Sequence, residues 1–401
     1  MTTAYLDHAA TTSVLPEVVA VVVRELERLG NPSSTHGPGR RARSTVEESR
    51  EDIADALDVH PTEVIFTSGG TESDNIAVTG TFHTRRTADP ARTRIVTTAL
   101  EHHAVLDQVE HLVATAGADV TWIEADADGV ITPAAFEEAL RGDRGPDDVA
   151  IASVMWANNE IGTVQDIPAL AEVTRGLGVP LHTDAVQALG QVDLPLAGLG
   201  RGNAPDLVAL TGHKIGGPVG TGLLLAARDQ TPAPAQRGGG QERGLRPGTL
   251  NVAGVAGLAT AVRYAVSHLR EHAARVGGLR DRLISGALDI DPTIRVSGPW
   301  EPGDLTHRLP GNAHLQIPGT DSDALLYLLD AAGVACSAGS ACTAGVTRPS
   351  HVLLACGVPE DLARGALRLT LGRTSTEADV DAFLTALPEV LDRARRARAA
   401  S

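Results

Sequence analysis

The sequence predicts an α/β protein with two domains, the larger of them built on a mostly parallel sheet of seven strands. Three observations support this prediction. Strand-like and helix-like segments alternate between residues 63 and 226, which is typical of βαβ units. The chain has 401 residues, which is too long for a single small core. Glycines and polar residues follow several expected strands, and open sheets bind ligands at such strand ends.

Two helices are expected before the alternation begins. The first runs from Pro16 to Leu29 and ends at Gly30, and the second, charged and amphipathic, runs from Arg40 to Leu57. Short apolar runs bounded by turn residues predict the strands of the sheet. The expected strands are 63–67, 94–98, 119–123, 149–154, 180–183, 207–210 and 222–226, and the expected helices between them are 72–85, 103–116, 133–140 and 167–177.

The last third of the chain has a different pattern. A glycine-rich link begins at Gly238, and a long helix is expected from about 251 to 288, with Gly277-Gly278 as the place for an interruption. A smaller α+β domain is then predicted from strands at 313–317 and 366–371 and helices at 323–332 and 377–399. We expect residues 16–255 to form the large domain, and residues 1–15 with 256–401 to form the small one.

The composition limits the partners and the compartment. A formal net charge of −16 argues against direct binding of nucleic acid, which needs clustered lysines and arginines. Three cysteines in a chain of this length do not predict a disulfide framework, so we expect a reducing compartment, the cytoplasm. The N-terminus shows no targeting pattern and no segment is long enough to span a bilayer, so we expect no membrane association.

Two strand ends could hold an anion and a flat ring. Thr67 is followed by a turn with Gly70 and Thr71, where a helix begins, and the backbone N–H groups and hydroxyls there favour an anion such as phosphate. The alternative is an ordinary capping box from Thr71 to Asp74. Past the next strand, His102 could stack on a ring or serve only in packing.

Two further strand ends carry amides and a carboxylate. Asn158 and Asn159 follow strand 149–154, and buried amides of this kind need partners from a ligand or the backbone. Asp184 follows strand 180–183, and Gln187 lies three residues later. The carboxylate could pair with a protonated ring nitrogen and the amide could bond a phenolate, or Asp184 could be a plain helix cap.

One lysine completes this set. Strand 207–210 runs into a glycine turn with Thr211, His213 and Lys214. A desolvated lysine there has a lowered pKa and a nucleophilic amine, and the alternative is a surface lysine in a loop. Phosphate cradle, imidazole, carboxylate and amine are together the groups needed to hold pyridoxal 5′-phosphate.

Small residues surround Cys342 in the stretch from Cys336 to Gly345, which predicts a mobile loop at about 335–349. An exposed thiol on such a loop suits a nucleophile that visits a site and then leaves, and the alternative is a small core residue. We interpret Cys356, in the apolar run 352–356, and Cys336 as structural.

With these residues placed, the chain resembles a pyridoxal-phosphate-dependent cysteine desulfurase of the IscS/NifS type, in the class-V aminotransferase family. The resemblance runs nearly end to end, and its motifs are together highly specific. They are the segments 5–12, 31–34, 67–75, 101–106, 158–162, 212–214, 238–243, 246–249, 339–343 and 371–373. The resemblance implies the fold type I of pyridoxal-phosphate-dependent transferases.

The resemblance also implies a role for each matching position. Lys214 matches the lysine that binds the cofactor covalently, His102 the imidazole that stacks on its ring and acts as acid or base, and Cys342 the cysteine that takes the sulfur as a persulfide. Arg368, helped by Asn31, matches the clamp for the substrate carboxylate. The other implied cofactor contacts are Gly70, Thr71, Asn159, Asp184, Gln187, Thr211, His213 and, from the second subunit of a homodimer, Thr249. No metal ligand is implied.

The implied reaction converts L-cysteine to L-alanine and passes the sulfur from Cys342 to an acceptor protein. The chain ends soon after helix 377–399 and lacks the C-terminal extension that helps dock an iron–sulfur scaffold in some family members. This argues against that docking partner, so tRNA thiolation and DNA sulfur modification are candidates for the pathway on equal terms with iron–sulfur assembly. A selenocysteine lyase or another fold-type-I enzyme is the alternative. Thr211 and Pro247 depart from the family pattern, since serine is common at both positions.

Overall fold

The computed structural model describes residues 4–339 and 349–400, and its largest sheet has seven strands. Their order is β2 (Val64–Thr67), β8 (Gly222–Ala226), β7 (Leu207–Thr211), β6 (Leu181–Asp184), β5 (Val149–Ser153), β3 (Arg94–Thr98) and β4 (Asp119–Ile123). β8 runs antiparallel to both of its neighbours, and all other neighbouring pairs are parallel. The predicted mostly parallel sheet is therefore confirmed.

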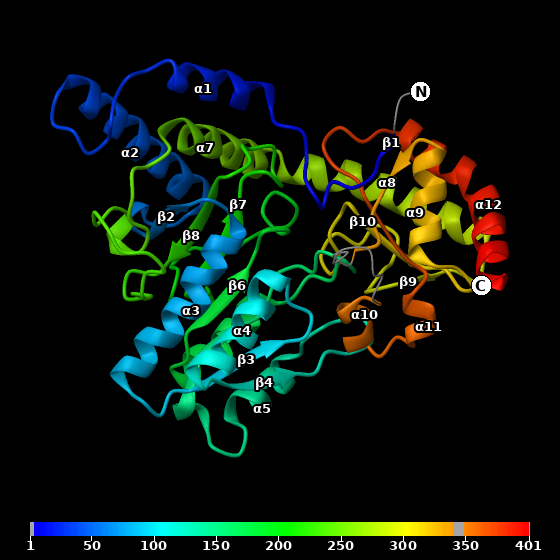
Figure 1. The fold of residues 1–401 in the computed structure, drawn as a ribbon, viewed down its shortest axis with the longest axis horizontal. Helices are drawn as coiled ribbons and strands as arrows, with labels where there is room; N and C mark the ends of the chain where they lie inside the picture. Colours follow the sequence, from blue (N-terminus) through cyan, green and yellow to red (C-terminus); the bar gives the residue numbers. More distant parts are fainter. Residues whose placement is uncertain (1–3, 340–348, 401) are drawn as a thin grey trace.

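Helices cover both faces of this sheet (Figure 1). One face shares a buried apolar core with α3 (Gly70–Ala88) and α4 (His103–Ala116). The other face packs against α2 (Gly37–Leu57), α5 (Pro133–Arg141), α6 (Ile167–Leu177) and α7 (Val252–Ser267), and α1 (Pro16–Leu26) packs on α7. Because both faces are buried, β5, β7 and β8 are almost continuous apolar runs, which is why they could be recognised in the sequence, whereas β6 is mostly polar.

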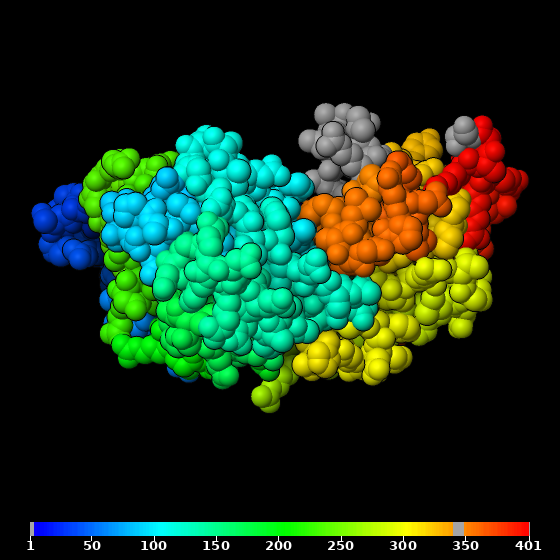
Figure 2. Space-filling model, turned by 90° about the horizontal axis from the view of Figure 1, so that it is seen from below, coloured from blue at the N-terminus to red at the C-terminus, as the bar shows by residue number. Residues whose placement is uncertain are grey.

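A second core lies at the other end of the molecule. Here β10 (Asn312–Gln316) pairs antiparallel with β12 (Ala366–Thr370) and with β9 (Arg295–Val296). Its apolar side chains come also from α8 (Leu269–Ile290), α9 (Ser322–Ala331) and α12 (Glu377–Ala399), and the short helices α10 (His351–Ala355) and α11 (Glu360–Ala363) precede β12. The space-filling view shows this part, yellow to red, at the end opposite the blue N-terminal helices (Figure 2).

The start of the chain folds onto this second core. β1 (Ala4–Tyr5) pairs in parallel with β11 (Val334–Ala335), and Leu6 is fully buried among the side chains of the core. The backbone N–H of Thr12 then donates to the carbonyl of His213, at 3.2 Å. Residues 7–12 therefore run from the second core to the ends of the central strands.

The single long helix expected at 251–288 is two helices. α7 ends at Ser267 and α8 begins at Leu269, with a bend of 70° between them. The predicted interruption at Gly277-Gly278 is wrong, because both glycines lie inside α8. A Cβ at Gly277 would come 2.6 Å from Leu305, so the glycine allows these two segments to pack closely. Among the described residues no single helix is long and apolar enough to cross a membrane. Only the bent pair α7–α8, when its two helices are taken together, has the length and apolar composition of a membrane span.

The glycine-rich link contains a buried ion pair. The Glu242 carboxylate accepts two hydrogen bonds from Arg50, at 2.7 and 3.0 Å, and one from the backbone N–H of Phe66 in β2, at 2.7 Å. Glu242 and Arg243 have φ angles of 48° and 58°, in the left-handed region that residues with a side chain rarely adopt. The ion pair therefore holds a strained turn against α2 and the edge strand.

Replacing Glu242 with alanine is expected to lower the free energy of unfolding by about 3–5 kcal/mol, because Arg50 would lose the partner of its buried charge. Chemical denaturation measures this loss. Glu47→Ala is the matched control: Glu47 also bonds Arg50, at 3.1 Å, but its side chain is half exposed, so a loss of about 1 kcal/mol or less is expected. Equal losses in the two variants would contradict the importance of the buried pair.

Candidate active site

One cavity brings together most of the residues that the sequence singled out. It lies beside the carboxyl ends of the central strands. Its lining includes Gly70, Thr71, His102, Asn159, Asp184, Gln187, Thr211, His213, Lys214 and Arg368. Asn31 and Thr249, both among the described residues, are exposed and lie outside this lining. Cys342 and most of its expected loop lie outside the described residues.

Lys214 lies three residues past the end of β7, in the glycine turn. Its side-chain amine donates to the backbone carbonyls of Ala9 and Ala10, the latter at 2.9 Å. Burial, with the nearby Arg368 charge second, lowers the pKa of Lys214 to about 8. The uncharged form of the amine is therefore a minor species near neutral pH but far more populated than in an ordinary lysine, and it can act as a nucleophile or a base.

The sequence has 34 lysines and arginines together, and Lys214 is the only lysine among them. This signal could have been found from the residues alone. A chain that uses arginine everywhere else retains lysine where an arginine could not serve, because a guanidinium stays protonated and is no nucleophile.

Asp184 ends β6 and lies in the wall of the cavity. One carboxylate oxygen accepts a hydrogen bond from the backbone N–H of Val186, at 2.8 Å, and no described helix begins there, so the plain helix cap is ruled out. Burial, with the charge of Asp74 next, raises the pKa of Asp184 to about 7. A cation placed against this carboxylate would lower its pKa again, so the position suits a protonated ring nitrogen.

The N-terminus of α3 faces the same cavity. The helix begins at Gly70, its preceding residue makes no side-chain cap, and Asp74 is 1% exposed beside β6, so the capping-box alternative is wrong. A Cβ at Gly70 would lie 2.6 Å from Val186, so only glycine fits here. Thr71 and His213 also line the cavity, and together with the free N–H groups of the first helical turn they suit an anion.

His102 precedes α4, and its hydrogen bonding fixes its tautomer. Its Nδ1 accepts from the backbone N–H of Ala104, at 3.1 Å, so the proton of the neutral ring is on Nε2. Burial lowers the pKa of His102, which keeps the imidazole neutral near pH 7. The neighbouring His103 is exposed and pairs with Asp107 at 3.0 Å instead. Of the two histidines, only His102 lines the cavity.

The two asparagines have different roles: Asn158 is structural and Asn159 faces the cavity. Asn158 donates to the carbonyl of Leu100 at 2.9 Å and accepts from the N–H groups of Glu160 and Ile161, so the backbone supplies its partners. Asn159 lines the cavity. Gln187 lines it too, and its amide donates to the carbonyl of Ala9 at 3.0 Å.

Comparison with known proteins agrees with this arrangement. The sequence profile of the class-V aminotransferases matches residues 4–383. The chain belongs to this family. A protein of Mycobacterium tuberculosis named IscS-like cysteine desulfurase is 52% identical over 398 residues, which cover 99% of this chain and 98% of that protein.

Two solved structures extend the comparison of this class-V aminotransferase. A NifS-like protein superposes with a TM-score of 0.86 at 33% identity, over 98% of this chain and 100% of the other. The structure of SspA in complex with cysteine has a TM-score of 0.73 at 29% identity, over 93% and 99% of the two chains. These relatives confirm the resemblance to cysteine desulfurases of the IscS/NifS type and the predicted fold.

Class-V aminotransferases of this type use pyridoxal 5′-phosphate, and the cavity fits this cofactor. The fit rests on a buried carboxylate, Asp184, that pairs with no lysine or arginine among the described residues, on the close approach at Gly70, and on the Lys214 amine, whose lowered pKa makes it easier to deprotonate. When bound, the cofactor supplies the electron sink for the bonds broken at the substrate Cα and Cβ.

Arg368 approaches the cavity from β12, the neighbour of β10 in the second core. Its guanidinium donates to the carbonyl of Asn159 at 2.9 Å and pairs with Asp7 at 3.0 Å, while its Nε has no hydrogen-bond partner in the described part of the chain. Asp7 was not predicted as a site residue, although it lies in the motif of residues 5–12. The pair orients the guanidinium, which can bind a carboxylate with two parallel bonds.

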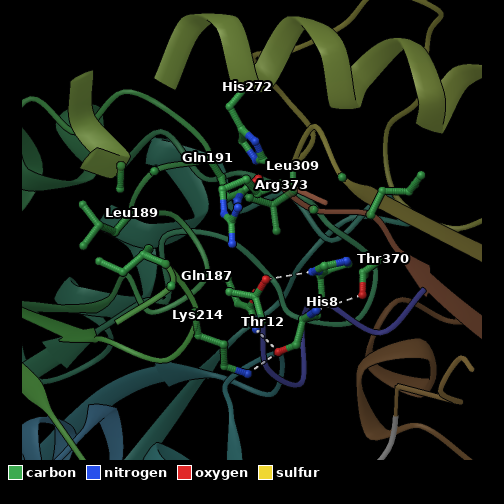
Figure 3. Close-up of a pocket in the computed structure, with 18 of the residues that line it drawn as sticks. His8, Thr12, Gln187, Leu189, Gln191, Lys214, His272, Leu309, Thr370 and Arg373 are labelled. Atoms are coloured by element: carbon green, nitrogen blue, oxygen red, sulfur yellow. Dashed lines mark hydrogen bonds between the residues drawn. The ribbon is translucent and has the colours of Figure 1, made fainter. Parts of the chain in front are cut away.

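A second cavity adjoins the first at Lys214, and Figure 3 shows residues that line it. Lys214, Gln187 and Ala9 belong to both linings. His8 bonds the Thr12 hydroxyl at 2.9 Å, and the N–H of Ala9 donates to the Thr370 hydroxyl at 2.8 Å. These bonds fix the N-terminal segment whose carbonyls hold the Lys214 amine.

The two described cysteines are free thiols packed against the cores. Cys336 lies against the second core and Cys356 against the larger one. Burial raises the pKa of each thiol to about 12, so both stay protonated and unreactive near neutral pH. Their packing agrees with the structural interpretation and leaves Cys342 as the remaining candidate for a reactive thiol.

Proposed function

We propose that this class-V aminotransferase is a cysteine desulfurase that converts L-cysteine to L-alanine and passes the sulfur, held as a persulfide on Cys342, to an acceptor protein. The observation that carries the proposal is the meeting of Lys214, Asp184 and Arg368 in one cavity. The names of the relatives support the activity, and the cysteine in complex with SspA, a structural neighbour, supports the substrate.

Each residue has a defined task in this proposal. Arg368 binds the substrate carboxylate, and Lys214 removes the proton from the substrate Cα. His102, with its proton on Nε2, would help hold the cofactor ring and would exchange a proton at that nitrogen. The Cys342 thiolate attacks the substrate sulfur, the Cβ–S bond breaks, and its electron pair stays with the carbon. Protonation of that carbon gives alanine, and the sulfur remains on Cys342 as the persulfide.

We also assign the protein as a homodimer in which Thr249 contacts the cofactor phosphate of the partner subunit. Thr249 is exposed in one chain and lies outside the cavity of that chain. Apolar side chains on α1 support an interface: Val19 and Val23 are each 49% exposed and Leu26 is 70% exposed. Asn31 lies just past α1 and is the proposed helper of Arg368 in substrate binding.

The proposal extends to the domains and the compartment. The larger domain carries the seven-stranded sheet and the smaller one carries β10 and its neighbours. α7 packs in the first core and α8 in the second, so we place the boundary at the bend between them rather than at residue 255. We place the protein in the cytoplasm, where a reducing environment preserves free thiols such as Cys336 and Cys356.

Replacing Cys342 with alanine is expected to abolish persulfide formation and to reduce alanine formation by about 10²-fold or more, since the thiolate is the nucleophile. Alkylation and mass spectrometry after L-cysteine addition locate the sulfur, and amino-acid analysis measures alanine. Cys356→Ala is the matched control and should keep both readouts, because its thiol is protonated. A Cys342→Ala protein that makes alanine and sulfide at the wild-type rate would instead identify a lyase.

A further inference from the structure

A cluster of four buried titratable side chains lies where β6 faces α3. Its members are Asp74, Glu101, His182 and Asp184, each no more than 4% exposed. His182 and Asp184 point the same way because residues two apart on a strand share a face. The other titratable groups that act on Asp184 are His102 and Lys214, both in the wall of the cavity.

Asp74 and His182 are linked to each other. Asp74 Oδ1 lies 3.3 Å from Nε2 of His182, and Nδ1 of the same ring lies 2.9 Å from the Ser153 hydroxyl. Within the described ranges neither Asp74 Oδ1 nor His182 Nε2 has a hydrogen-bond partner of good geometry, and the 3.3 Å approach is the polar contact between them. Because unpaired buried polar atoms are costly, a proton held between these two atoms would satisfy both.

The local charges decide where that proton is held. Burial lowers the pKa of His182 to about 4, so the imidazole is neutral. Burial also raises the pKa values of Asp74 and Glu101 well above the usual range. An ionised Asp74 would place a like charge beside Asp184 in a site that excludes water, which further disfavours ionisation of both.

We propose that Asp74 is a positioning residue, a protonated carboxylic acid whose O–H donates to Nε2 of His182, and that it leaves Asp184 as the only anion available to the cofactor ring nitrogen. His182 Nδ1–H then donates to the Ser153 hydroxyl. The inference rests on the proposed pyridoxal-phosphate function. Asp74 borders the cavity, and as a neutral acid it contributes a dipole rather than a second charge.

The first test uses the cofactor-free protein and infrared spectroscopy at pH 7. A carboxylic acid has a C=O stretch that an ionised carboxylate lacks. The difference spectrum between wild type and Asp74→Asn should show the loss of one such band, and the Glu101→Gln spectrum identifies the separate band of Glu101. If Asp74→Asn removes no acid band, Asp74 is ionised and the proposal is wrong. This result is independent of any activity.

The second test uses protein loaded with ¹⁵N-labelled pyridoxal 5′-phosphate. An amide at position 74 keeps a donor toward His182, so Asp74→Asn should retain the protonated-ring nitrogen resonance and change the cofactor dissociation constant by no more than about threefold. Asp184→Asn should lose the protonated resonance. If Asp74→Asn loses it to the same extent, Asp74 is itself a charged partner of the ring and the inference is overturned.

A third variant keeps the proposal testable if Asp74→Asn does not fold. His182→Asn retains a polar group near Ser153 but removes the acceptor at Nε2. The acid band of Asp74 in the cofactor-free protein should move to higher frequency, because its O–H loses the imidazole. An unchanged band would show that Asp74 does not donate to His182. Failure of the cofactor to bind to wild-type protein would count against the proposed function and would leave both infrared tests valid.

Discussion

Replacing Lys214 with alanine is expected to reduce alanine formation from L-cysteine by about 10³-fold or more, because the cavity loses its amine nucleophile and its nearest base. Borohydride reduction of loaded wild-type protein should fix the cofactor covalently to one tryptic peptide. Since the sequence contains no second lysine, the Lys214→Ala protein should carry no label on any internal peptide, and the N-terminal amine is the one other site to check. A label of normal yield in Lys214→Ala would contradict the assignment of the nucleophile.

The matched control adds a lysine where it should have no effect. Arg228 is more than half exposed, and Arg228→Lys introduces an amine far from any cofactor contact. This variant should keep wild-type activity and gain no cofactor label. The pH dependence gives a second check: the rate of cofactor attachment to wild type should rise with pH and level off above about 8, as the Lys214 amine loses its proton. A rate that keeps rising to pH 10 would show an ordinary lysine.

Replacing Arg368 with glutamine is expected to lower kcat/KM for L-cysteine by about 10²-fold, because charge-assisted hydrogen bonds to the substrate carboxylate are lost. Steady-state kinetics should show the loss mainly in KM if the guanidinium binds the ground state and the transition state equally. The Arg368 charge also lowers the pKa of Lys214, so its removal should shift the pH profile of cofactor attachment to higher pH.

Arg364→Gln is the control for Arg368→Gln. Arg364 is four residues earlier and pairs with Glu360 on the surface, where both side chains are exposed. Its replacement should change kcat/KM and the pH profile by no more than experimental error, as for other exposed pairs. If Arg368→Gln raises KM without moving the pH profile, the arginine binds substrate but does not act on Lys214.

The elements that carry the chemistry could be predicted because their signals are local. β7 is a short apolar run that leads into the glycine turn with Lys214, and the alternation of strands and helices predicted the strand before Asp184 although that strand has only one apolar residue, Leu181. The bend at His268 could not be predicted in this way, since the apolar periodicity continues from α7 into α8 and the change of direction is fixed by which core each helix joins.

Contacts between distant residues account for the rest. The pair of Arg368 with Asp7 joins positions 361 residues apart, and no local pattern encodes it. Asp74 illustrates the opposite difficulty: Thr71 and Asp74 fit the spacing of a capping box, and only the packing of α3 on β6 shows that the carboxyl is buried against His182. The N-terminal motif was recognised, but its carbonyls at Ala9 and Ala10 became partners of Lys214 only in the folded chain.

The single lysine has a practical consequence for handling the protein. Reagents that react with primary amines, such as active esters, reducing sugars and surface-coupling chemistries, find only two kinds of target here, the N-terminus and Lys214. Bound cofactor protects Lys214, so only the N-terminus of the loaded enzyme still reacts. Immobilisation or dye labelling of the loaded enzyme through amines should therefore attach every molecule by the same end and leave its arginines unmodified.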